Sequence, residues 1–333
     1  MDKRLMRAFE VAYLVVVSLA VSACSAPASH ENSQASASLN WMLPTTGGSQ
    51  FWTDVQHRSG WRIQRHFATG HFRLLDAGNF RQAWGTQQQC AEQLNTQMNS
   101  IPANQETVLI LAHGMGRTAN SWGSMTRYVQ AETNWQIIPF AYASTRKPIH
   151  KHAAALAQLI QTLGPEVKTI HLVGHSLGSI VIRHYLADTE PNPDSRLGRF
   201  IMIGPPNQGS RMARILYPTL IFPLLTGPSG VSLGRGWEEL KGHLSIPTIE
   251  FGIIAGGHRD NSQGWNPLLK GASDGAVSLT EALLPGASDV MVRPLLHSTM
   301  MNHPEVCRAS LRFLRTGCFT EDGIKHPVQS QAE

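Results

Sequence analysis

Residues 169–188, TIHLVGHSLGSIVIRHYLAD, restrict the folds open to this chain more than any other stretch. Apolar residues before Gly174 suit a buried strand, and apolar residues after Gly178 recur at helical spacing. A strand is therefore expected to run into a helix through one sharp turn. Side chains at Gly174 or Gly178 would collide there with the neighbouring strand or helix. We expect Ser176 to project from the tip of this turn, at the N-terminal end of the helix, where the backbone favours negative charge.

Segments on both sides alternate between strand and helix patterns. This alternation predicts the α/β class, with a mostly parallel central sheet and helices on both faces. Segments 61–67 and 71–75, joined by the Thr69-Gly70 turn, predict an antiparallel hairpin at the sheet edge. We expect one folded domain over residues 51–320. Further strands are expected at 108–112, 135–142, 200–203, 249–255 and 290–292, and helices at 87–98, 124–133, 152–163 and 304–315.

The first 24 residues have the pattern of a signal peptide. Basic residues precede an apolar run at 11–23, which is too short to span a bilayer as a helix. The sequence Val-Ser-Ala-Cys at 21–24 resembles the bacterial lipobox, which implies lipid attachment at Cys24. Ser25, the residue after this cysteine, resembles the pattern of lipoproteins that are sorted to the outer membrane. The prediction is therefore a lipid-anchored protein of the bacterial cell envelope. Ordinary cleavage after an alanine, giving a secreted protein, is the alternative.

The composition of the chain limits the classes of partner and cofactor that are expected. Charged residues make up 15% of the chain and the net charge of +5 is spread without a basic block, which argues against nucleic acid. No Cys-x-x-Cys or His-Glu-x-x-His spacing indicates a metal, and no cofactor is implied. Cys90, Cys307 and Cys318 are the remaining cysteines. Their odd number prevents complete pairing, and a bridge between Cys307 and Cys318 is left open.

Three segments fall outside the regular alternation. Residues 25–50 are rich in small and polar residues and predict a flexible tether, and residues 321–333 predict a polar tail. Residues 211–240 are apolar but interrupted by prolines at 218, 223 and 228, which forbid one long helix. This insertion is interpreted as a lid or acyl-chain pocket over the site, or as a segment that packs on the core.

A serine at such a turn can act as a nucleophile if a base and an orienting acid lie within reach. Asp274 is the favoured acid, because its Asp-Gly turn follows the strand at 249–255, and acids of such folds lie at the carboxyl ends of strands. Asp289, just before the next strand, is the alternative. His297 is the favoured base because it lies on the loop before the last helix. His303, the alternative, precedes Pro304 and suits a helix start.

Stabilising the oxyanion requires two N–H donors. One is expected from the backbone of Leu177, the residue after Ser176. The other is expected from the glycine-flanked Met115, which follows the strand at 108–112. Removing one such donor lowers the rate by roughly 10² to 10³ in enzymes where this has been measured.

Several motifs in fixed order carry a resemblance to a known family. HGMGR at 113–117, YASTR at 142–146, GHSLG at 174–178, GPPNQGS at 204–210 and DGAV at 274–277 resemble those of α/β-hydrolases of the bacterial lipase/esterase type, over about 61–319. The resemblance implies the α/β-hydrolase fold and cleavage of a small-molecule or lipid ester by Ser176, Asp274 and His297. The alternatives are an acyltransferase that uses the same acyl-enzyme and a non-catalytic envelope binding protein.

Overall fold

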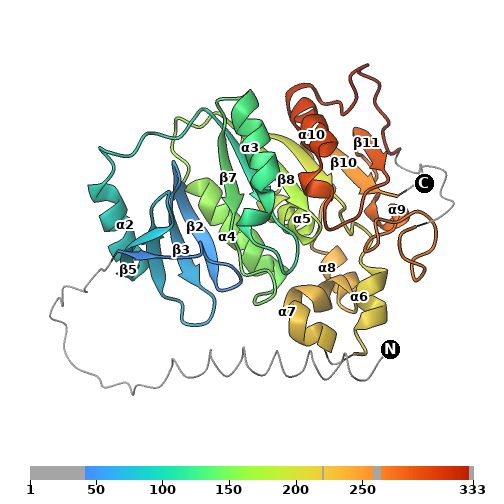
Figure 1. The fold of residues 1–333 in the computed structure, drawn as a ribbon, viewed down its shortest axis with the longest axis horizontal. Helices are drawn as coiled ribbons and strands as arrows, with labels where there is room; N and C mark the ends of the chain where they lie inside the picture. Colours follow the sequence, from blue (N-terminus) through green and yellow to red (C-terminus); the bar gives the residue numbers. More distant parts are fainter. Residues whose placement is uncertain (1–41, 220, 258–263, 330–333) are drawn as a thin grey trace. The chain divides into compact units, whose positions relative to one another are not determined.

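The computed structural model describes residues 42–219, 221–257 and 264–329. In these ranges six strands form a sheet in the order β11-β10-β9-β8-β6-β7, and every neighbouring pair is parallel (Figure 1). The predicted parallel sheet is confirmed. Its strands are β6 (Thr107–Ala112), β7 (Gln136–Phe140), β8 (Thr169–His175), β9 (Leu197–Ile203), β10 (Phe251–Gly256) and β11 (Asp289–Arg293).

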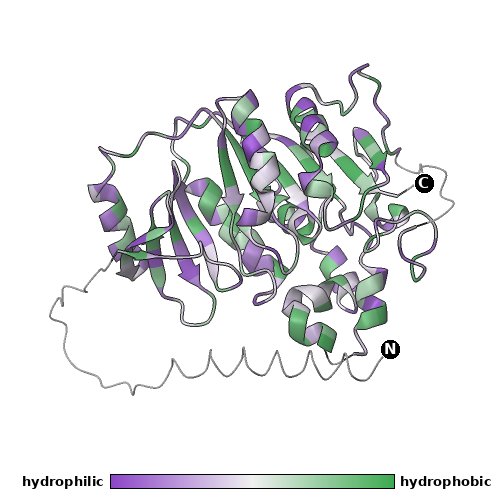
Figure 2. Ribbon diagram, viewed as in Figure 1, coloured by the Kyte–Doolittle hydropathy of each residue, from purple (hydrophilic) through white to green (hydrophobic). Residues whose placement is uncertain are grey.

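Helices cover both faces of this sheet, as predicted. In β6, Val108 and Ile110 pack on the face covered by α4 (Ile149–Gln161) and α5 (Leu177–Thr189). Leu109 and Leu111 pack on the face covered by α3 (Gly123–Glu132) and α10 (Pro304–Thr316). Burial on both faces explains why the strands read as continuous apolar runs, which are green in Figure 2. Each such side chain contributes about 1.5–3 kcal/mol when fully buried.

A second, antiparallel sheet precedes the parallel one. Its order is β1-β5-β4-β3-β2, and its core packs on α2 (Gln87–Thr96). The predicted hairpin is present as β3 and β4, but it belongs to this separate sheet and not to the edge of the parallel one. The strands are β1 (Leu43–Pro44), β2 (Trp52–Arg58), β3 (Trp61–His66), β4 (Phe72–Leu75) and β5 (Phe80–Gly85).

Two predicted boundaries differ from the structure. The predicted tether reached residue 50, but Leu43 and Pro44 already pair with β5. The predicted polar tail began at 321, but the backbone N–H groups of His326 and Val328 donate to the Asp289 carboxylate and to the Ala287 carbonyl. Backbone pairing of polar segments leaves little trace in hydropathy. The signal segment 1–24, with Cys24, lies outside the described residues.

The apolar insertion forms α6 (Arg211–Leu216), α7 (Ile221–Leu233) and α8 (Trp237–Lys241), with η1 (Ala119–Trp122), α9 (Leu279–Ala282) and η2 (Met300–Asn302) elsewhere. A kink at Gly227, where φ is +62°, breaks α7 just before Pro228. Leu233 and Trp237 are buried in the core, whereas Leu224 and Leu225 on the outer part of α7 are exposed. Figure 2 shows apolar turns in α6 and α7.

Cys90, Cys307 and Cys318 are free and buried, so the bridge left open by the sequence is not formed. Within the described ranges no helix is long and apolar enough to cross a membrane.

Candidate active site

Ser176 occupies a strained turn between β8, which ends at His175, and α5, which begins at Leu177. Its φ of 52° and ψ of −120° are rare for a residue with a side chain. A Cβ at Gly178 would lie 2.1 Å from the Ala112 carbonyl oxygen, and one at Gly174 would lie 2.5 Å from the Ser179 nitrogen. The predicted steric need for both glycines is confirmed.

The other predicted site residues come after the carboxyl ends of other strands in the same sheet. The loop carrying Met115 follows β6, Asp274 comes after β10, and His297 comes after β11. A Cβ at Gly256, the last residue of β10, would lie 2.4 Å from the Asp274 Cβ. Because parallel strands end at the same edge of a sheet, these loops gather beside the Ser176 turn.

His297 and Asp274 form a close pair. His297 Nδ1 lies 2.7 Å from Asp274 Oδ2, and the Asp274 side chain is 1% exposed. The other carboxylate oxygen accepts from the N–H groups of Ala276, at 2.9 Å, and Val277, at 2.7 Å. The His297 amide also donates to the Asp274 carbonyl, at 2.9 Å. Since the carboxylate can only accept, the network assigns the proton to Nδ1 and leaves His297 Nε2 as an acceptor.

Gly204 and His175 surround this pair, and sequence reasoning assigned a role to neither. Gly204 follows β9 with a φ of +55°, and a Cβ there would lie 3.0 Å from His297 Nδ1. His175 Nε2 lies 3.0 Å from the His297 carbonyl oxygen, to which it donates. Burial, and secondarily the charges of His297 and Arg117, hold the pKa of His175 well below its usual value. A neutral His175 therefore supports the loop of His297.

Some of the predicted site residues form no hydrogen bond with the His297–Asp274 pair in the part of the chain that the structure describes. Among the described residues Ser176 Oγ forms no hydrogen bond with His297, although the imidazole rings of His297 and His175 have centroids 4.8 Å apart. Catalytic hydrogen bonds are often long in unliganded enzymes. Asp289 is the first residue of β11 and so lies at the amino end of this strand, whereas Ser176 follows the carboxyl end of β8. The Asp289 carboxylate accepts from the Phe319 N–H at 2.7 Å. His303 lies at the start of α10. Neither alternative joins the His297–Asp274 pair.

The two predicted oxyanion donors come from different segments. Leu177 is the first residue of α5, and Met115 lies in the loop after β6. In the described part of the chain, neither amide N–H donates to another backbone group, as the predicted role of an oxyanion donor requires. His113 at the base of this loop stacks on Tyr142, with ring centroids 4.2 Å apart. Burial lowers the pKa of His113 to about 4, which keeps it uncharged at neutral pH.

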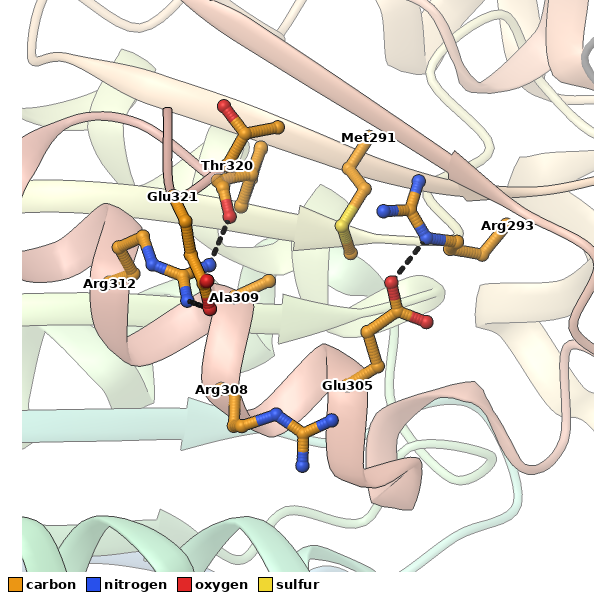
Figure 3. A pocket seen from close by; sticks show the side chains of 9 residues that line it. Met291, Arg293, Glu305, Arg308, Ala309, Arg312, Thr320 and Glu321 are labelled. Carbon is orange, nitrogen blue, oxygen red and sulfur yellow. Dashed lines mark hydrogen bonds and ion pairs between the residues drawn. The ribbon is translucent and has the colours of Figure 1, made fainter. Parts of the chain in front are cut away.

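A cavity of about 350 Å³ lies between β11, α10 and residues 319–321 (Figure 3). Arg293 pairs with Glu305 and Arg312 with Glu321 along it, each at 2.5 Å. None of the predicted site residues lines this cavity. No cluster of three or more metal-ligating side chains occurs among the residues that the structure describes.

Comparison with known proteins places the fold. Residues 109–322 match the model described as the alpha/beta hydrolase family. The Bacillus licheniformis lipase BlEst2 in its mature form is similar at 18% identity, with a TM-score of 0.51 over 65% of this chain and 93% of that chain. Its propeptide form has 18% identity and a TM-score of 0.53 over 70% of this chain and 53% of that one. No curated protein sequence matches significantly. The antiparallel sheet lies outside the matched residues.

Proposed function

This chain belongs to the alpha/beta hydrolase family, and from that premise we propose that it hydrolyses carboxylic esters with Ser176 as the nucleophile. One observation carries the proposal. The buried Asp274 carboxylate holds His297 Nδ1 at 2.7 Å, on loops at the same sheet edge as the strained Ser176 turn. An acid that orients a histidine close to a half-buried serine is the arrangement of nucleophilic ester hydrolysis.

The proposed reaction has two halves. Ser176 Oγ attacks the ester carbonyl carbon while its proton moves to His297 Nε2, and Asp274 stabilises the resulting imidazolium. The N–H groups of Met115 and Leu177 bind the oxygen that becomes negative. The tetrahedral intermediate then expels the alcohol, which takes the proton from His297. Water repeats the sequence on the acyl-enzyme and releases the acid.

We further propose that α6 and α7 form an acyl-binding cover over this site. A Cβ at Gly227 of α7 would lie 1.8 Å from the Thr145 carbonyl oxygen, and one at Gly230 would lie 3.3 Å from Met115 Sδ. These contacts place α7 against the loops after β6 and β7. Its exposed leucines suit an apolar acyl chain.

The N-terminal pattern supports anchoring of the mature protein to the bacterial envelope through a lipid on Cys24. Mass spectrometry of the protein expressed in a Gram-negative host tests this proposal. An acylated N-terminal peptide beginning at Cys24 is expected, and Cys24→Ser should abolish it. An unmodified N-terminus after an alanine would favour the secreted alternative.

The decisive variant is Ser176→Ala. Turnover of a short p-nitrophenyl ester should fall by about 10³-fold or more, and labelling by a fluorophosphonate probe should disappear. Wild-type turnover in S176A would refute the mechanism. Absent labelling of the wild-type protein would favour the binding alternative, and ester products formed with added glycerol would favour the acyltransferase.

A further inference from the structure

The side chain of Gln50 connects two loops that follow strands of the parallel sheet. Its Nε2 donates to the Arg117 carbonyl at 2.5 Å. Its Oε1 accepts from Ser144 Oγ at 3.0 Å, and from Thr145 N and Oγ1 at 3.0 and 3.1 Å. A carbonyl can only accept and a backbone N–H can only donate, so these partners fix the orientation of the side-chain amide. Gln50 therefore uses both ends of its amide to connect the loops after β6 and β7.

The same contacts continue into the proposed catalytic machinery. Ser144 Oγ accepts from the N–H of Gly116, the residue after Met115, at 3.0 Å. The Arg117 guanidinium donates to the carbonyl of Ser298, the residue after His297, at 2.6 Å. The two residues that follow Met115 are thus both held within this network. A shift of Gln50 would move the Met115 amide and disturb the loop of His297.

The antiparallel sheet fixes the position of Gln50. At the start of β2, Asp54 N donates to the Ala141 carbonyl at 2.8 Å, and Ala141 N donates back to Asp54 Oδ2 at 2.8 Å. Ala143 N adds a bond to Thr53 Oγ1 at 3.3 Å. Asp54 is fully buried, so its two contacts to Ala141 are shielded from water. The start of β2 is thereby attached to the loop after β7, four residues along the chain from Gln50.

We propose that Gln50 is a positioning residue that holds the 115–117 loop so that the Met115 amide meets the developing oxyanion. The inference rests on the proposed ester hydrolysis. It makes the antiparallel sheet part of the catalytic unit, although the family match begins only at residue 109. Oxyanion donors must be held in place before the reaction, because reorganisation during the reaction would offset their contribution.

Gln50→Glu tests the proposal with almost no change in shape. The carboxylate retains the bonds from Ser144 and Thr145, but turns a repelling oxygen toward the Arg117 carbonyl. We expect kcat to fall about 10- to 100-fold while KM stays within about twofold. The inhibition constant of a trifluoromethyl ketone, which forms a tetrahedral adduct with the serine, should rise by the same factor as kcat falls. Gln56→Glu in β2 is the matched control with unchanged kcat, because the Gln56 side chain bonds to no other described residue.

Each outcome decides the question. Unchanged kcat and inhibition constant in a folded Q50E protein would overturn the positioning role, as would a rise in KM alone. If Q50E fails to fold by circular dichroism, Ser144→Ala replaces it. That variant loses the acceptor of Gly116 N–H and should lower kcat with little change in KM, whereas wild-type kinetics would refute the proposal. An inactive wild-type protein would count against the proposed function instead.

Discussion

Two buried aspartates, Asp274 and Asp289, have similar hydrogen bonds but lie at opposite ends of the parallel strands. Asp274 and Asp289 each accept two backbone N–H bonds and are each nearly inaccessible to water. Asp274 comes after β10 and also holds His297, whereas Asp289 begins β11 and fastens residues 319 and 326. The strand end that carries each residue therefore separates a proposed catalytic group from a structural one.

Replacing each of these aspartates by asparagine should separate the two roles. In Asp274→Asn the amide can donate to His297 Nδ1 and favour the wrong tautomer, so kcat should fall about 10³- to 10⁴-fold with little change in folding. Asp289→Asn should leave kcat within a few-fold of wild type and lower the free energy of unfolding by about 1–3 kcal/mol. Ester turnover and urea unfolding measure both. The reverse pattern would make Asp289 the functional acid.

Some helices and strands could be predicted from the sequence and others could not. The parallel strands and their helices were predictable because burial on both faces demands continuous apolar runs. The strands β2 and β5 carry Asp, Gln, His and Arg among their apolar residues and were not predicted. The equally polar β3 was predicted together with β4 because the Thr69-Gly70 turn joins them. The site divided in the same way. The Ser176 turn and the Asp-Gly turn have sequence signals, but Gln50 lies in a stretch of tether-like composition and acts only through tertiary contacts.

The outer part of α7 offers a prediction at the scale of one element. Leu224 and Leu225 are more than half exposed, so replacing both with serine should change the unfolding free energy by only about 0.5 kcal/mol. If α7 contacts the acyl chain, kcat/KM for long-chain esters should fall several-fold while short-chain esters are unaffected. Ile324→Ser, at a similarly exposed residue of the C-terminal segment, is the control. An equal loss for all chain lengths would argue against acyl binding.

Buried histidines shape the pH dependence of the whole molecule. Burial lowers the pKa of His57 and His152 to about 3 and of His113 and His171 to about 4. Below pH 6.5 these histidines therefore bind protons in the unfolded chain but not in the folded protein. The free energy of unfolding consequently decreases as the pH is lowered. Each group should cost on the order of 1 kcal/mol between pH 7 and pH 5. The raised pKa of Asp54 opposes this effect, but this one carboxyl is outnumbered by the four histidines and by His175, whose pKa burial also lowers.

Urea unfolding at pH 5, 6 and 7.5 measures this dependence. The free energy of unfolding should fall steadily toward pH 5. His152→Gln should flatten the dependence, whereas His326→Gln, at an exposed position, should leave it unchanged. A stability that rises toward pH 5, or equal slopes in both variants, would contradict the assignment.

The free buried cysteines give each sheet its own chemical reporter. Cys90 lies in the core beneath the antiparallel sheet, and Cys307 lies in α10 against the parallel sheet. Burial raises the pKa of both thiols to about 11, so alkylation requires local opening. A timed pulse of iodoacetamide followed by peptide mass spectrometry would measure the alkylation rates of both cysteines in one sample. If the bonds at Ala141 and Gln50 join the two sheets into one cooperative unit, Cys90 and Cys307 will be labelled at the same rate.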